Sequence, residues 1–251
     1  MSEVRVFQDL DRLCLEARKL FRSGSPQKQG EVELVFNVCL DLLRSIGKFK
    51  KPEEWKDSRE EHTLSVLIQA IETVLAMYYL SESGFWDNSL ALKRNVAELM
   101  LIAVAVGYDR QCFVDWKHER EPFDDFNRVL RRVQASTDIP EVEKSLLPHL
   151  KRYWVESSQL FSHNVRLESI RTLPKGGPFK FEPKLVQIEF QEKRLNTIRN
   201  MLIDIISISA GVFQYDVVVS RKKAEFPEAP EIITRCNKCM QNEDWRRQGT
   251  A

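Results

Sequence analysis

The sequence predicts an all-α protein: a multi-helix bundle of about seven to eight helices, followed by an irregular C-terminal tail. Glycine and proline are scarce, with 9 and 10 residues among 251. The long stretches between them are rich in Leu, Glu, Lys, Arg and Ala, which favour helix. Apolar residues recur every three to four positions over most of the chain, which is the spacing of one helix face.

The first two helices are predicted at about 6–21 and 31–46, each with one apolar face. The polar stretch SGSPQKQG separates them. Two antiparallel helices joined by a short loop are therefore expected over 1–49, as a hairpin arm of a single bundle domain that spans 1–219.

The next two helices carry clearer signals. Ser58 and Glu61 have the spacing of a capping box, and the helix that they begin continues to about Tyr78. The following helix, at about 85–106, is apolar on nearly every side after Glu98. A helix of that kind belongs in the middle of a bundle.

The rest of the body is predicted to be helical with breaks at prolines. Pro122 separates two short helices, and Pro148 interrupts a longer one. These helices are expected at about 108–118, 123–134, a segment through Ile170, and 184–215. Residues 220–251 change in composition and are expected to form a tail.

Charge and cysteine usage exclude several classes of protein. Lys+Arg (38) and Asp+Glu (37) nearly cancel. The chain therefore lacks the overall excess of basic residues that is typical of non-specific nucleic-acid binding. Five cysteines, an odd number, predict no disulfide framework. The longest apolar run, 99–106, is well short of the ~18 residues that cross a bilayer. With no apolar signal region at its start, the chain is expected to be cytoplasmic and without membrane segments.

Metal and cofactor signatures are incomplete. Cys236 and Cys239 form a single C-x-x-C, whereas a zinc site of this type uses two such pairs. These two cysteines are the only metal-ligand candidates, and neither a metal nor a cofactor is predicted. Gly176 and Gly177 lie in a proline-rich loop and not between a strand and a helix, so no phosphate-binding loop is indicated.

Two polar clusters are candidates for a site. Arg94 and Glu98 are four positions apart on an otherwise apolar helix, so they share one face. They form either a salt bridge near the surface or a pair in which Glu98 orients Arg94 into a polar pocket. His163 stands among aromatic residues in YWVESSQLFSHNVRLESIR, with Asn164 and Arg166 beside it. It is either a hydrogen-bonded structural residue or an acid/base group.

Two segments together, LALKRNVAELMLIAVAVGYDRQCFVDW and RYWVESSQLFSHNVRLESI, resemble the HEPN-like helical proteins of bacteria over about 85–172. The resemblance implies an all-α bundle, commonly dimeric, in families tied to RNA cleavage or phage defence. The nuclease motif of that family has a histidine about one turn after an arginine in the same helix. Arg94 has no histidine close after it, and Arg152 precedes His163 by three turns.

The prediction is therefore a non-enzymatic, HEPN-like binding or interaction protein, part of a bacterial defence or mobile-element system. It is expected to be a homodimer, with protein or RNA as a partner. Its polar pocket is expected to contain the following residues: Arg94, Glu98, Tyr153, His163, Asn164 and Arg166. The alternative is a divergent ribonuclease or other hydrolase, in which His163 is the acid/base and Arg94 or Arg166 stabilises phosphate charge.

Overall fold

The computed structural model describes residues 3–50, 52–118, 125–159, 188–222 and 224–241, and within these ranges helices are joined by turns without any strand. The all-α prediction is confirmed. The helices are α1 (Glu3–Gly24), α2 (Pro26–Gly47), α3 (Pro52–Trp55), α4 (Arg59–Glu82), α5 (Trp86–Tyr108), α6 (Arg110–Lys117), α7 (Phe126–Ala135), α8 (Glu141–Lys144), α9 (Leu147–Gln159), α11 (Ile188–Val212), α12 (Tyr215–Arg221) and α13 (Ala229–Gln241).

The described residues thus contain more helices than the seven to eight expected. Part of the excess is short connecting helices, since α3 and α8 have four residues each. One of them begins at a proline and the other comes directly after a proline. Proline is tolerated in the first turn of a helix, but it ends a helix that precedes it. Periodicity over a long window does not detect single turns of this length.

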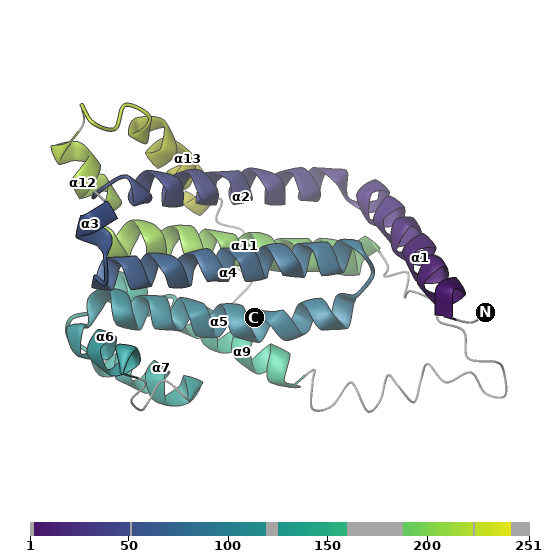
Figure 1. The fold of residues 1–251 in the computed structure, drawn as a ribbon, viewed down its shortest axis with the longest axis horizontal. Coiled ribbons are helices and arrows are strands. Elements are labelled where there is room, and N and C mark those ends of the chain that lie inside the picture. Colours follow the sequence, from purple (N-terminus) through teal and green to yellow (C-terminus); the bar gives the residue numbers. More distant parts are fainter. Residues whose placement is uncertain (1–2, 51, 119–124, 160–187, 223, 242–251) are drawn as a thin grey trace.

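Four long helices of 22 to 25 residues form the body: α2, α4, α5 and α11. They lie side by side, with α4 running opposite to the other three (Figure 1). α4 packs mainly on α5, and α2 packs mainly on α11, while α11 also touches α4 and α5. Direct contact between α2 and α4 is slight, so a space is left between these two helices above α11.

α5 occupies the position that its composition predicts. Val96, Ala97 and Met100 are fully buried, as are the residues from Ala103 to Val106. α4 covers one side of α5, and α9 packs on it as well. Ser58 caps α4 by accepting a hydrogen bond from the Glu61 amide at 3.1 Å, as the capping box predicts. The Glu61 carboxylate, however, accepts from the amide of Asp57 and not of Ser58.

The predicted hairpin of the first two helices is wrong. Only Ser25 stands between α1 and α2, which is too short to reverse the chain, since antiparallel helix pairs need about 2–5 loop residues. α2 instead belongs to the central bundle, and α1 bends away from its end (Figure 1). Phe21, buried to 1% exposure, anchors the last turns of α1 to the body.

The predicted irregular tail is also wrong over α13. Ile232, Cys236 and Cys239 recur at helical spacing and are buried, and α13 packs on α2 and α11. The expected domain boundary at 219 falls inside α12. Short helices with a narrow apolar face gain most of their stability from tertiary packing, so the local sequence signal for α13 is faint.

One helix among the described residues, α4, is long and apolar enough to cross a membrane, and α11 with α12 would pass the same test as a pair bent by 50°. Both α4 and α11 pack among other helices of the bundle (Figure 1). Because the core helix of a bundle has the same length and composition, this finding is weak support for a membrane span.

Candidate ligand-binding groove

Arg94 and Glu98 form the pair that their spacing predicts. The Nε of Arg94 donates to Glu98 Oε1 at 2.8 Å, and the side chains are 50% and 33% exposed. Trp154 Nε1 of α9 donates to the same oxygen at 2.9 Å, and the Arg94 guanidinium lies 5.0 Å from the Trp154 ring centroid. The pair therefore fastens α9 to α5 at the surface.

A hollow of about 300 Å³ lies beside this pair. Phe126, at the start of α7, stacks on Trp154 with 5.0 Å between ring centroids and 6° between planes. Asp125 caps α7 through hydrogen bonds from the amides of Asn127 and Arg128. Arg94 and Glu98 thus line a small hollow, but the charged and aromatic groups around it already satisfy one another.

Tyr153 is not part of that hollow. It is 2% exposed, and its hydroxyl donates to Asp204 Oδ2 of α11 at 3.0 Å. Successive residues of a helix point about 100° apart, so Tyr153 and Trp154 face different neighbours. His163, Asn164 and Arg166 lie outside the described residues. Their place in a pocket with Arg94 remains a prediction.

Cys236 and Cys239 are buried and free, and the described part of the chain contains no group of three or more His, Cys, Asp or Glu residues placed to hold a metal. Burial, with Cys239 nearby, raises the pKa of the Cys236 thiol to about 12. Burial also raises the pKa of Cys39 on α2, and the neighbouring Cys236 and Cys239 add to the effect. The C-x-x-C pair therefore serves as part of the α13–α2 packing.

A buried polar cluster at the α5–α9–α11 seam was missed by sequence reasoning. Asp204 is 1% exposed; besides Tyr153, it faces His149, whose Nδ1 lies 3.8 Å from Asp204 Oδ1. Lys93 pairs with Glu156, and its ammonium lies 5.1 Å from the Tyr153 ring centroid. Burial raises the pKa of Asp204 and lowers that of Lys93. The sequence signal for this cluster was a single acidic residue, Asp204, within the apolar run MLIDIISI.

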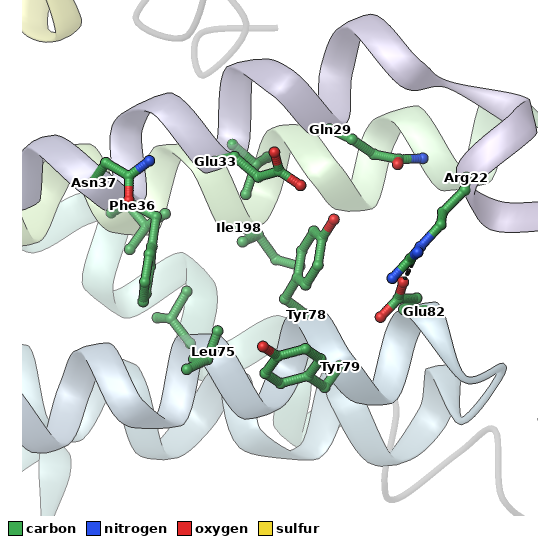
Figure 2. A pocket seen from close by; sticks show the side chains of 13 residues that line it. Arg22, Gln29, Glu33, Phe36, Asn37, Leu75, Tyr78, Tyr79, Glu82 and Ile198 are labelled. Carbon is green, nitrogen blue, oxygen red and sulfur yellow. Dashed lines mark hydrogen bonds and ion pairs between the residues drawn. The ribbon is translucent and has the colours of Figure 1, made fainter. Parts of the chain in front are cut away.

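A larger hollow, of about 600 Å³, lies between α2 and α4 (Figure 2). It exists because these helices pack on α11 and α5 more than on each other. Its floor and walls are mostly apolar and aromatic. They include the following residues: Val32, Phe36, Leu75, Tyr78, Tyr79, Ile198 and Leu202. We call this hollow the α2–α4 groove.

One end of the α2–α4 groove is charged. Arg22 Nε of α1 donates to Glu82 Oε1 of α4 at 2.6 Å (Figure 2). The Glu82 side chain is 4% exposed, whereas that of Arg22 is 70% exposed. Glu33 lies on the wall formed by α2. The buried carboxylate of Glu82 is thus paired with the guanidinium group of Arg22, a side chain that is mostly exposed to solvent.

The bend between α1 and α2 fixes the position of Arg22. The Gln29 side-chain amide donates to the carbonyl oxygen of Phe21 at 2.5 Å. Gly24 lies so close to α11 that a Cβ at this position would be 2.5 Å from Gln191 Oε1. Arg18 Nε donates to Ser83 Oγ at 3.2 Å, next to the end of α4. The last turns of α1 are therefore held over the C-terminus of α4.

Tyr78 lies in the middle of the groove, where burial and nearby charges change the pKa of its hydroxyl. Its ring meets Phe21 edge-on at 5.8 Å and Tyr79 at 6.1 Å between centroids. Burial raises the pKa of Tyr78 to about 12, and the carboxylates of Glu33 and Glu82 add to the rise. The Tyr78 hydroxyl therefore stays protonated near neutral pH, mainly because it is buried.

Comparison with known proteins gives no relative. The chain matches no protein-family model, no curated protein and no solved structure. The likeness to HEPN-like proteins therefore rests on the two sequence segments alone.

Proposed function

We propose that this chain is a non-enzymatic binding protein, cytoplasmic and HEPN-like in architecture, that acts in a bacterial defence or mobile-element system. We propose further that its ligand lies in the α2–α4 groove. The observation that carries this proposal is the groove itself, an open hollow of about 600 Å³ with an apolar floor and polar groups at its ends.

The size and lining of the groove fit a small organic ligand. Ligand pockets in proteins commonly measure roughly 300–1,000 Å³ and combine an apolar lining with a few polar groups. Ile198 and Leu202 of α11 supply an apolar floor, Phe36 and Tyr78 supply aromatic surface, and Glu82 supplies a polar contact. The apolar surface supports affinity, and the polar groups fix the orientation of the ligand.

The lining supports binding over hydrolysis. It contains no histidine, cysteine, serine, threonine or lysine among the described residues, so it offers no serine, threonine or cysteine nucleophile paired with a histidine or lysine base. Tyr78, with a pKa of about 12, is a poor proton donor or acceptor near neutral pH. The alternative of a hydrolase depends on His163, which lies outside the described residues.

Filling the groove tests the proposal. We expect the purified chain to bind a neutral apolar dye such as Nile red saturably, with one site per chain, in a fluorescence titration. Leu75→Trp places a bulky ring in the groove, so the dye should bind roughly tenfold or more weakly, as when about 1.4 kcal/mol of contact is lost.

Val142→Trp is the matched control, since Val142 lies on α8 away from the groove lining and is 69% exposed. This variant should bind the dye as the wild type does. Equal weakening by the two substitutions, or no saturable binding by the wild type, would contradict the proposal.

A further inference from the structure

We infer that the α2–α4 groove selects an organic cation, an ammonium or guanidinium group on an apolar body, whose charged group replaces Arg22 at Glu82. This inference rests on the proposed function, because it names the chemical class of the ligand in the same groove.

The charge of the groove favours a cation. Among the residues that the structure describes, its lining contains two carboxylates, Glu33 and Glu82, and a single basic side chain, Arg22. Glu82 is nearly removed from water at 4% exposure, and a buried carboxylate requires a cation or several hydrogen-bond donors. Once Arg22 moves away, no other basic side chain among the described lining residues faces Glu82, so an incoming cation would supply the required charge.

The end of α4 strengthens the same preference. Glu82 is the last residue of α4, and the C-terminal end of a helix carries partial negative charge. The side chains of Tyr78 and Tyr79 line the adjoining part of the groove (Figure 2). Aromatic faces attract ammonium and guanidinium groups, so the rings favour the same kind of ligand as the carboxylate.

Arg22 is placed to leave without unfolding its helix. Its side chain is 70% exposed, and its Nε contacts one oxygen of Glu82. The backbone of this turn is held by the buried Phe21 and by the hydrogen bond from Gln29. Rotation of the Arg22 side chain alone therefore uncovers Glu82, and Arg22 acts as an internal competitor of the ligand.

The apolar body has a defined place in the groove. Arg22 and Glu82 lie at one end, Phe36 and Asn37 lie at the other, and Tyr78 lies between them (Figure 2). A ligand with its charge at Glu82 would extend its apolar part over the α11 floor. An amine without an apolar part would not contact the α11 floor. A neutral apolar molecule would make that contact but would not displace Arg22 from Glu82.

Three probes of equal chain length separate these contributions in calorimetric titrations at pH 7: n-octylammonium, 1-octanol and octanoate. We expect octylammonium to bind at least about tenfold more tightly than octanol, as a charge-assisted hydrogen bond allows, and octanoate to bind least. Glu82→Gln should remove this advantage and leave octanol binding unchanged. Glu231→Gln, at an exposed position on α13, is the matched control and should bind all three probes as the wild type does.

Arg22→Met keeps the length of the side chain and removes its charge. If Arg22 competes with the ligand, this variant should bind octylammonium roughly threefold or more tightly, because a larger fraction of the protein has Glu82 free. Circular dichroism of each variant shows whether it is folded.

The outcomes separate the two proposals. Equal binding of octylammonium and octanol, or octylammonium binding that survives Glu82→Gln, overturns the preference for a cation but leaves the groove as a ligand site. Weaker octylammonium binding by Arg22→Met overturns the role of Arg22 as a competitor. Failure of all three probes to bind contradicts the proposed function as well.

Discussion

Glu143 of α8 is a buried carboxyl group from which we expect a pH-dependent stability. It is 3% exposed, and its Oε1 accepts a hydrogen bond from the Tyr108 hydroxyl at 3.0 Å. Its Oε2 is buried without a hydrogen-bond partner among the described residues. Gly211 of α11 lies directly against it, since a Cβ there would be 2.0 Å from Oε1. Burial raises the pKa of Glu143 to about 7.

The raised pKa predicts that Glu143 destabilises the fold as pH increases. Below the usual pKa of 4.5 the carboxyl is protonated in the folded and unfolded chains, so it costs nothing. As pH rises from there to about 7, the unfolded chain releases its proton first, and the free energy of unfolding falls by about 3 kcal/mol. Glu143→Gln should remove this dependence.

Urea unfolding at pH 5 and pH 8 measures the effect. The free energy of unfolding of the variant minus that of the wild type should be larger at pH 8 than at pH 5. Any destabilisation caused by the amide itself is the same at both pH values and does not affect this comparison. A difference between the two proteins that stays the same at both pH values would show that Glu143 is not held with a raised pKa.

At the scale of helices, α5 and α11 approach closely at Gly107. A Cβ at this position would lie 2.5 Å from Val212 Cγ1 and 3.3 Å from Thr63 Cγ2. Glycine is required here because any side chain would push α11 away from α5. Gly30, on the outer side of α2, has no atom of the described part of the chain within 4 Å of the same added carbon.

These two glycines predict opposite effects of one substitution. Gly107→Ala should destabilise the protein by about 1–3 kcal/mol, because the packed helices must shift. Gly30→Ala should stabilise it by about 0.5–1 kcal/mol, because alanine is the better helix former and nothing obstructs it. Chemical denaturation of both variants measures the two changes. Equal effects of the same sign would be inconsistent with a close α5–α11 crossing at Gly107.

At the scale of the whole molecule, α1 extends beyond the four-helix body, and three apolar side chains of α2 and α4 remain exposed to solvent: Leu34, Ile68 and Tyr79 at 55%, 43% and 54%. The net charge of +1 gives little repulsion between copies of the chain. Both features are compatible with the association that the HEPN-like resemblance implies.

We expect the purified protein to be a homodimer. Light scattering during size-exclusion chromatography should give twice the chain mass of 29.4 kDa, and this mass should persist on dilution into the micromolar range. A mass of one chain at all concentrations would contradict the prediction and would remove one expectation carried by the HEPN-like resemblance.

The sequence by itself determined the helical class and most of the buried faces. Helical spacing of apolar residues and the scarcity of glycine and proline define α2, α4, α5 and α11, and the uniform apolarity of residues 99–106 places α5 inside. The Arg94–Glu98 pair also follows from local spacing. These features depend on neighbours within one or two turns, which a sequence displays directly.

The tertiary structure alone decided the candidate site. Arg22, Glu33 and Glu82 come from three helices, and they meet because α1 bends over the end of α4 while α2 and α4 stand apart above α11. Periodicity tells which side of a helix is buried but not which helix covers it. The groove depends on which helices pack against each other. No local pattern in MYYLSE therefore shows that Glu82 is the buried charge at the end of the groove.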